Sequence, residues 1–369
     1  ESRPPRRDPC ATAPRMLVEG AAPGIVDVVR TIVFTGAAGA ATASVVAAVL
    51  HDSEDASAVM LTPRPMTVPR ARVHPVDLVG VDLDAHLDGA AAVVHLGCPV
   101  DESDPYQMAE GRAVDEARAV LDAATRCGVA DVVVVSSALV LGALASNPVP
   151  LTERAVVHPA PGFRPAVEMA EIERLVAERR ADGATITVVR AAPVVADASP
   201  GWLAAELHRS LAYPVDDCDP GLQYLHADDL GSAIATVLRV APGGVVHAAP
   251  DGALSGADRR ALETRPRLRV PDPVARLASS VRAAASGTGT PEGIRPYLAE
   301  EWLLANDRLR ELGWEPSQSN EQAYVAAFRA APWSMIPSGR RQELLLGGLG
   351  VVAAGAAVVA GVLARRRHR

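Results

Sequence analysis

The sequence predicts an α/β protein with a doubly wound parallel sheet, and three observations support this prediction. Short runs of Val, Ile and other apolar residues recur without alternating polar positions, as in strands buried on both faces. Helical segments of about 10–15 residues separate these runs. A glycine-rich turn joins the first run to the first helical segment. This order indicates a Rossmann-type domain, with a smaller C-terminal region completing a substrate-side cleft.

The individual elements follow from these runs. The expected strands are Arg30–Thr35, Ala58–Leu61, Ala92–Leu96, Asp131–Val135 and Thr185–Val189. The expected helices between them are Val45–His51, Val114–Cys127 and Met169–Arg180. After residue 195 the order is less regular, and the expected segments are Gly201–Leu211, Gln223–His226, Asp228–Val240 and Asn306–Leu312.

Composition divides the chain into six parts. Residues 1–24 are rich in Pro and Arg and predict a disordered arm. The parts that follow are a nucleotide-binding domain (25–195), the smaller C-terminal region (196–332), a linker (333–343), one transmembrane helix (344–364) and a basic tail (365–369).

The apolar segment Leu344–Ala364 predicts a membrane anchor. Its 21 residues carry no charge, and at about 1.5 Å per residue they span roughly 31 Å, the thickness of a bilayer core. Four arginines follow it and two precede it, which favours a cytoplasmic C-terminus. A nucleotide cofactor and the lack of a visible export signal favour a cytoplasmic domain instead, which is the orientation we expect. Small residues at Ala353, Ala357 and Gly361 suit contact with another helix in a membrane-protein complex.

Composition also argues against several kinds of site. All 36 basic residues are arginine, so the chain has no lysine for a Schiff base or a phosphate loop. A formal net charge of −8 and 3% aromatic residues argue against nucleic acid as a partner. The cysteines show no metal-ligand spacing, so no metal is expected; they are Cys10, Cys98, Cys127 and Cys218.

The glycine-rich turn is the first candidate site, with the sequence TGAAGAAT from Thr35 to Thr42. Gly36 and Gly39 free the backbone for a tight turn and for approach of a pyrophosphate to the helix N-terminus. Thr42 stands at the third small position, where the helix packs on the strand. The expected ligand is NAD or NADP, in a catalytic or a structural role. A shell of the same fold that binds nothing is the alternative.

The acidic residue that normally binds the ribose hydroxyls of NAD is missing after the second strand. Thr62 occupies its place, and Arg64 follows two residues later. An arginine there can accept the 2′-phosphate of NADP, so both cofactors remain open.

Further segments occur in a fixed order after this turn. They are Asp77-Leu78 ahead of Gly89, Ala92–Cys98 (AVVHLGC), Val114–Ala124 (VDEARAVLDAA), Val135–Gly142 (VSSALVLG), Arg190–Val195 (RAAPVV), Leu225–Leu230 (LHADDL) and Leu312–Pro316 (LGWEP). Together they resemble the extended short-chain dehydrogenase/reductases, the NAD-dependent epimerase/dehydratase family, over roughly residues 30–330. The resemblance implies cofactor contacts from Thr35, Gly36, Gly39, Thr42, Arg64, Asp77, Leu78, Leu96, Gly97, Ser137 and Pro193.

The resemblance also implies catalysis by a Ser and by a Tyr-x-x-x-Lys pair. The tyrosine hydroxyl exchanges a proton with the substrate, and the ammonium lowers its pKa. Ser137 matches the serine. A gapless register places Phe163 and Val167 at the Tyr and Lys positions, whereas a register slid by two residues places Pro165 and Met169 there. Neither register supplies the pair, and no lysine elsewhere in the chain can replace the missing one.

Other charged or titratable side chains are candidate substitutes for the missing Tyr and Lys. Arg164 can supply positive charge, although a guanidinium is not interchangeable with an ammonium. Glu168 is expected to be solvated on its helix, and His95 to be a buried core histidine. His158 is a further candidate of the same kind as His95, and His226 belongs to a segment expected to cap a helix.

Two functions remain open. The first is a membrane-anchored, catalytically degenerate NAD(P)-binding protein that acts as a binding, regulatory or accessory subunit. The second is an active NAD(P)-dependent epimerase or reductase on a nucleotide sugar or a membrane-linked substrate, with a non-standard base and Ser137 orienting the carbonyl. The missing pair and the predicted anchor favour the first.

Overall fold

The computed structural model describes residues 30–53, 55–97, 104–181, 185–211, 219–262, 291 and 293–328. The expected arm (1–24), linker (333–343), apolar segment (344–364) and basic tail (365–369) lie outside the described residues. Within the described part of the chain, none of the helices has the length and apolar character needed to cross a membrane.

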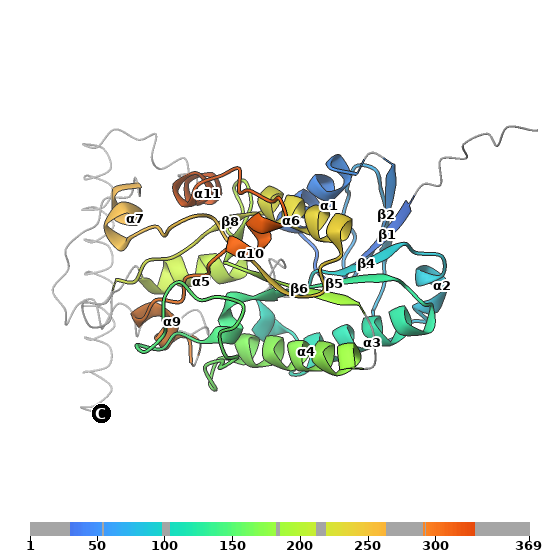
Figure 1. Ribbon diagram of the computed structural model, residues 1–369, viewed down its shortest axis with the longest axis horizontal. Coiled ribbons are helices and arrows are strands. Elements are labelled where there is room, and N and C mark those ends of the chain that lie inside the picture. Colours follow the sequence, from blue (N-terminus) through green and yellow to red (C-terminus); the bar gives the residue numbers. More distant parts are fainter. Residues whose placement is uncertain are drawn as a thin grey trace, which may run out of the picture.

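Seven parallel strands form one sheet in the order β3-β2-β1-β4-β5-β6-β9 (Figure 1). They are β1 (Arg30–Thr35), β2 (Ala56–Thr62), β3 (Ala71–Pro75), β4 (Ala92–His95), β5 (Asp131–Ser137), β6 (Ile186–Ala191) and β9 (Gly244–Ala248). The prediction of a parallel sheet is confirmed. Because β2 and β4 flank β1, the strand order reverses there, and such a point opens a crevice at the carboxyl ends of the strands.

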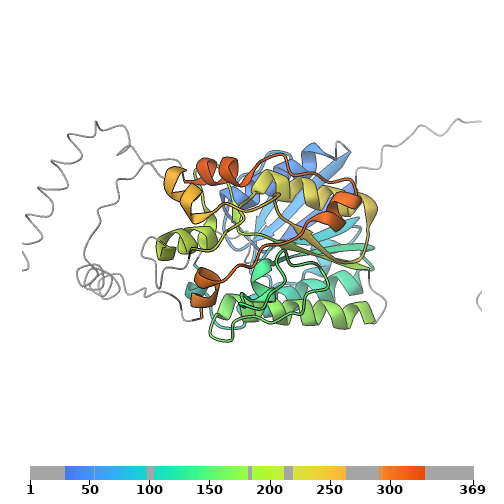
Figure 2. The same cartoon turned by 60° about the vertical axis from the view of Figure 1, so that its left-hand side comes forward.

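Helices cover both faces of the sheet (Figures 1 and 2). One face carries α1 (Ala40–His51) and α6 (Ala227–Val240), and the other carries α3 (Arg112–Arg126) and α4 (Arg164–Ala181). The helices α1 and α6 approach closely because Gly231 has no side chain. A Cβ there would lie 2.7 Å from the carbonyl oxygen of Val45.

The region after residue 195 is interleaved with the first domain. It supplies β9 to the sheet and α6 to the layer over α1. Four other described helices of this region gather at one end of the molecule (Figures 1 and 2); they are α5 (Gly201–Leu211), α7 (Gly256–Leu262), α9 (Arg295–Ala299) and α11 (Asn320–Ala327). The smaller elements are α2 (Asp84–Leu87), α10 (Asp307–Glu311), the short pair β7 (Val194–Val195) and β8 (Leu225–His226), and the 3₁₀ turns η1 (Pro105–Gln107) and η2 (Ala138–Leu141).

Two strands of the seven-stranded sheet, β3 and β9, are absent from the predicted set. The strand β3 is mostly exposed and has the polar sequence ARVHP, so it shows no apolar run. The strand β9 is short and follows Gly243. The helix α4 begins at Arg164, ahead of the predicted start at Met169, because a proline in the first turn does not interrupt a helix.

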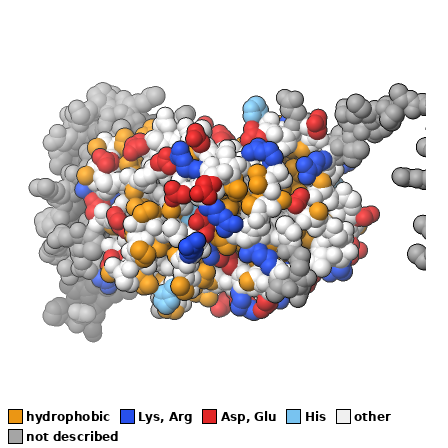
Figure 3. Space-filling model, in the orientation of Figure 1, with side chains coloured by type: hydrophobic (Ala, Val, Ile, Leu, Met, Phe, Trp, Pro, Cys, Tyr) orange, Lys and Arg blue, Asp and Glu red, His pale blue; other side chains and the backbone are white. Residues whose placement is uncertain are grey.

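Charged side chains of both signs are interspersed on the face seen in Figure 3. Charged side chains of the described surface also pair locally, as Arg174 does with Glu171 and Glu178 on α4. A mixed surface of this kind does not create a strong field of one sign.

Candidate functional site

A cleft of about 580 Å³ opens where the glycine-rich turn, the residues after β2, the end of β4, α3 and α4 meet. Of the residues expected to contact a cofactor, Gly36, Arg64 and Gly97 line this cleft. The volume lies in the range of organic-ligand sites, and its place at the strand reversal is where open α/β sheets bind ligands.

The glycine-rich turn forms a backbone cradle at one wall of the cleft. Gly36 has φ of 100°, and a Cβ on it would lie 2.9 Å from the Gly97 nitrogen. Gly39 precedes α1, whose first turn has neither a side-chain cap nor an acidic residue. Thr42, in the same turn, is fully buried, and its Oγ1 has no hydrogen-bond partner. A helix N-terminus without a capping side chain or an acidic residue suits an anion, so this cradle fits the diphosphate of a dinucleotide.

Thr35 and His95 lie side by side at the ends of β1 and β4, with 2.9 Å between Oγ1 and Nδ1. Burial lowers the pKa of His95 to about 4, so its imidazole is neutral near pH 7. His95 is buried as predicted, but it also forms part of the cleft wall. Leu96, also predicted as a contact, is buried and donates its N–H to the Thr35 carbonyl at 3.0 Å.

The tip of β2 presents Arg64 to the cleft. The Thr62 hydroxyl is buried and donates to the Arg64 carbonyl at 3.3 Å. The Arg64 guanidinium turns back to the glycine-rich turn, where Nη2 donates to the Ala38 carbonyl at 3.0 Å. Arg64 therefore connects the end of β2 with the turn that would hold a diphosphate.

Asp77 lies beside the cleft and pairs with Arg112, a lining residue. This hydrogen bond from Arg112 and a second from the Val79 N–H lower the pKa of Asp77. Arg112 also donates through Nε to Glu116 Oε1 at 2.8 Å. Leu78, the residue after Asp77, is buried in the core. Arg112 and Glu116 stand four residues apart, the spacing of an ion pair on a helix. The predicted helix begins at Val114 and leaves out Arg112, so sequence reasoning missed this pair.

The two registers of the missing pair place the lysine position on opposite faces of α4. Val167 is 39% exposed and does not line the cleft, whereas Met169 is 2% exposed and does. Pro165 is also buried. The gapless register thus puts its Lys-equivalent residue on the outer surface, and Met169 occupies the position that faces the cleft.

The acidic residues of α4 support the same register. Glu173 is buried, pairs with Arg190 at 2.7 Å and accepts a hydrogen bond from Ser136 at 2.6 Å. Glu171, on which the gapless register depends, pairs with Arg174 on the surface. Matching Glu173 gives the register with Pro165 and Met169.

The other predicted catalytic positions lie in packed surroundings. Phe163 is fully buried, and its ring centroid lies 5.5 Å from that of Tyr297 and 6.1 Å from that of Trp202. Ser137 is buried at the end of β5, where its hydroxyl accepts from the Leu139 N–H at 3.3 Å and caps η2. Pro193 lies between β6 and β7 and does not line the cleft.

Arg164 and Glu168 bind the segment that leads into α3. Arg164 donates to the carbonyls of Pro105 and Met108, and its guanidinium lies 4.8 Å from the centre of the Tyr106 ring. Glu168 is not solvated, contrary to expectation, because it accepts from the Gly111 N–H at 2.9 Å. Both side chains therefore have structural partners and stand outside the cleft lining.

The remaining candidates have structural surroundings too. His158 is exposed. His226 caps α6 through Nδ1, which accepts from the Asp228 N–H at 3.3 Å, so the capping prediction is confirmed. The described part of the chain holds no group of three metal-ligating side chains placed to share an ion.

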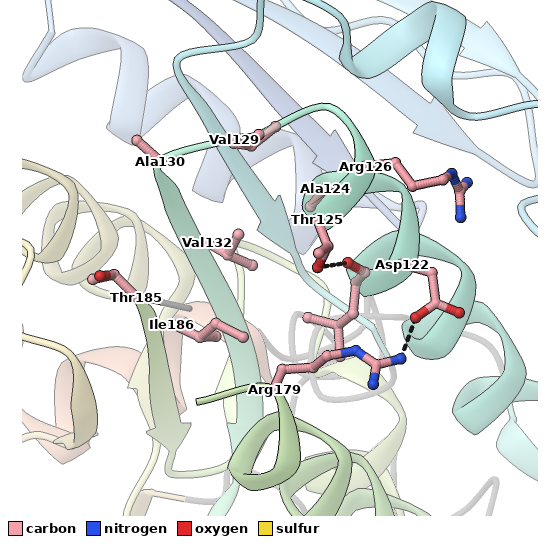
Figure 4. A pocket seen from close by; sticks show the side chains of 12 residues that line it. Asp122, Ala124, Thr125, Arg126, Val129, Ala130, Val132, Arg179, Thr185 and Ile186 are labelled. Atoms are coloured by element: carbon pink, nitrogen blue, oxygen red, sulfur yellow. Dashed lines mark hydrogen bonds and ion pairs between the residues drawn. The ribbon is translucent and has the colours of Figure 1, made fainter. Parts of the chain in front are cut away.

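A second cavity, of about 630 Å³, lies at the opposite edge of the sheet, beside the amino ends of β5 and β6 (Figure 4). Asp122 and Arg179 pair with each other across it, and the Thr125 hydroxyl donates to the Leu121 carbonyl at 2.9 Å. Arg126 turns to Asp84 at 2.7 Å. The charged groups beside this second cavity are thus paired with protein groups and leave no charge directed at a ligand. We therefore take the cleft at the carboxyl ends of the strands as the candidate site.

Comparison with known families gives one match over more than half of the chain. The profile of a family described as "NAD dependent epimerase/dehydratase family" matches residues 32–248. A search of curated proteins finds no match.

Several solved structures share the fold. MoeE5 in complex with UDP-glucuronic acid and NAD is 18% identical, with a TM-score of 0.58 over 80% of this chain and 97% of that one. UDP-glucose 4-epimerase of Thermus thermophilus in complex with NAD is 16% identical, with a TM-score of 0.58 over 82% and 99%. The dTDP-glucose 4,6-dehydratase DesIV of Streptomyces venezuelae, a double mutant with NAD and DAU bound, is 19% identical, with a TM-score of 0.57 over 82% and 97%.

Proposed function

Since the chain belongs to the NAD-dependent epimerase/dehydratase family, we propose that it binds NAD(P) without performing the family's proton transfer. In this proposal it is a membrane-anchored binding, regulatory or accessory subunit. Bound NAD(P) would supply a nicotinamide that exchanges hydride. The chain's own contribution is to hold the nucleotide: the cradle at Gly36 and Gly39 takes the diphosphate, and Arg64 meets the adenosine end.

One observation carries the proposal: Met169, which stands at the lysine position in the register slid by two residues, faces the cleft from α4. A thioether has no titratable proton and no charge, so it cannot tune a neighbouring hydroxyl. The described lining contains no tyrosine to be tuned. Both parts of the proton-transfer pair are therefore missing from this cleft.

Among the described residues that line the cleft, none supplies a clear substitute base. His95 is bonded to Thr35, and its low pKa makes it a weak base. Glu116 accepts a hydrogen bond from Arg112, and Asp104 accepts from the Tyr106 N–H at 2.9 Å. No particular side chain of the described lining therefore supports an active epimerase or reductase. Such an activity is the alternative function, and the turnover assays described below would detect it.

The membrane part of the proposal depends on the sequence of Leu344–Ala364, with the large domain on the cytoplasmic side. A domain held at a membrane and deprived of its proton-transfer pair suits an accessory role in a membrane-protein complex.

Calorimetric titration of the full-length protein in detergent with NAD⁺ and NADP⁺ tests the binding. Turnover assays with UDP-glucose and dTDP-glucose then test the lack of chemistry. We expect a nucleotide to bind and no turnover to follow. Turnover that disappears in Ser137→Ala would establish the active-enzyme alternative, and a protein that binds neither nucleotide would refute the proposal.

A further inference from the structure

Arg112 brings into the cleft a guanidinium that two carboxylates hold in place. It is the first residue of α3, and it lines the cleft. Its Nε donates to Glu116 Oε1 at 2.8 Å, one turn further along the helix, and its Nη2 donates to Asp77 Oδ1. The same oxygen of Asp77 accepts from the Val79 N–H at 3.0 Å. The guanidinium is therefore fixed from two sides, by its own helix and by the segment after β3.

These two carboxylates determine what Arg112 can offer to a ligand. They compensate the positive charge of the guanidinium, so Arg112 is a poor partner for a further anion such as a diphosphate. The guanidinium keeps its flat shape. Its hydrogen bonds lie in the plane of the group, and the faces of such a plane stack on aromatic rings. The pairing therefore favours a flat ring over a phosphate as the partner of Arg112.

Arg112 acts on the adenosine side of the cleft. The sheet runs β3-β2-β1-β4, and the cradle at Gly36 follows β1. Arg64, which meets the adenosine end in the proposed function, follows β2. Asp77, the residue that Arg112 reaches, follows β3 on the far side of β2. In a dinucleotide bound with its diphosphate in the cradle, the flat ring on this side is the purine base.

Asp77 is the other candidate for contact with the base. The family resemblance implies a cofactor contact there, and a carboxylate accepts hydrogen bonds from an amino group such as that of adenine. In this chain, Asp77 lies beside the cleft and outside its described lining. Its Oδ1 already accepts from Arg112 and from Val79. Because Arg112 is the one of the two that lines the cleft, Asp77 acts on a ligand through Arg112.

We propose that the purine base of the bound dinucleotide stacks on the guanidinium of Arg112, and that Asp77 is a positioning residue that holds this guanidinium. The inference rests on the proposed function, because it assumes that a dinucleotide occupies the cleft. It adds how the base is recognised. Stacking uses the face of the ring and not its amino group, so the cleft accepts purine bases other than adenine.

Calorimetry on the full-length protein in detergent tests this specificity. The ligands are whichever of NAD⁺ and NADP⁺ binds more tightly, its 1,N⁶-etheno derivative and its hypoxanthine analogue. The etheno bridge removes the N–H donors of the amino group, and hypoxanthine carries a carbonyl in its place. Because all three bases can stack, their dissociation constants should agree within about threefold. A larger loss of affinity for either analogue would overturn the inference.

A lysine substitution separates the flat group from its charge. Arg112→Lys keeps the positive charge between the two carboxylates and removes the plane, so all three ligands should bind at least about threefold more weakly. Arg118→Lys is the matched control, because Arg118 is exposed on the same helix and does not line the cleft. It should leave every affinity unchanged. Unchanged affinities in Arg112→Lys would mean that charge alone matters and would overturn the inference.

Asp77→Ala distinguishes a positioning residue from one that contacts the base. Positioning predicts that all three ligands lose affinity by the same factor, since each of them stacks on a less firmly held guanidinium. A loss confined to the adenine cofactor would show direct contact with its amino group, and no loss at all would show that Asp77 is not needed; either result would overturn the assignment. Thermal unfolding of each variant without ligand confirms that it is folded.

The results that overturn this inference leave the proposed function standing, because each of them is measured on a protein that binds a dinucleotide. If neither NAD⁺ nor NADP⁺ binds, the proposed function fails first and this inference fails with it.

Discussion

Met169 and Val167 lie two residues apart on α4 and face opposite ways: Met169 lines the cleft, and Val167 is on the outer surface. Two residues of an α-helix turn through about 200°, so a register error of two residues exchanges an inner position for an outer one. The interpretation of the active-site residues therefore depends on which face of this helix is turned inward.

Lysine substitutions at these two positions test the assignment directly. Met169→Lys buries an ammonium without a partner, so it should lower the free energy of unfolding of the ligand-free protein by about 1–3 kcal/mol. The same ammonium should strengthen binding of a dinucleotide, because it lies in the cleft that receives the diphosphate. Urea unfolding and calorimetry measure the two effects.

Val167→Lys is the matched control and should change the free energy of unfolding by less than about 0.5 kcal/mol, with unchanged binding. The opposite pattern, with a large effect at Val167 and none at Met169, would restore the gapless register.

Breaking the buried ion pair between Glu173 and Arg190 should lower the free energy of unfolding more than breaking an ion pair on the surface. Removing one partner leaves a buried charge uncompensated, so Glu173→Gln should cost about 3–5 kcal/mol of unfolding free energy. The exposed Glu171→Gln, two residues away, should cost less than about 1 kcal/mol. Urea unfolding of both variants measures the difference. Similar costs would mean that Glu173 is not the buried acid.

The cradle of the cleft depends on the absence of a side chain at Gly36. Gly36→Ala adds a Cβ that would lie 2.9 Å from the Gly97 nitrogen, at a φ of 100°. Nucleotide binding should fall by at least about tenfold, since the backbone must shift where the diphosphate sits. Gly89→Ala provides the control, because Gly89 also has positive φ but a Cβ there meets nothing within 4 Å. It should keep its affinity in the same calorimetric titration, and an equal loss in both variants would point to general strain.

Two buried histidines should make the fold sensitive to acid. Burial lowers the pKa of His95 to about 4, and burial together with the nearby Arg190 lowers the pKa of His247 to about 3, from a usual value of 6.5. As the pH falls, the unfolded state therefore binds protons before the folded state does. The histidine contribution to the free energy of unfolding is complete above about pH 6.5 and is lost below it, by up to about 1.4 kcal/mol per pH unit for each group.

Urea unfolding at about pH 7 and about pH 5 measures this loss. His247→Leu replaces the imidazole with an apolar side chain of similar bulk that cannot titrate. The decrease in the free energy of unfolding between the two pH values should therefore become smaller. A decline that matches the unsubstituted protein would show that His247 does not contribute.

Much of the sheet was predictable because buried parallel strands are continuous apolar runs. The strand β3 was not, since its exposed ARVHP sequence gives no such run, and β9 was missed because it is short and joins the sheet from a distant part of the chain. The glycine-rich turn and Arg64 were predictable because their chemistry follows directly from a strand. The cleft-facing position of Met169 was not predictable from the sequence. Glu171 and Glu173 match the family's glutamate equally well, and they differ only in their burial. Arg112 and Glu116 enter the cleft through helix packing, which one sequence does not display.

We propose above that the cleft holds a nucleotide and transfers no proton. A single-turnover experiment tests it most directly: full-length protein in detergent, at a concentration close to that of added NAD⁺ or NADP⁺, is mixed with UDP-glucose or dTDP-glucose, and the fluorescence of reduced cofactor is followed. We expect nucleotide to be bound and no reduced cofactor to form. Reduced cofactor that accumulates with the unsubstituted protein and fails to appear with Ser137→Ala would contradict it.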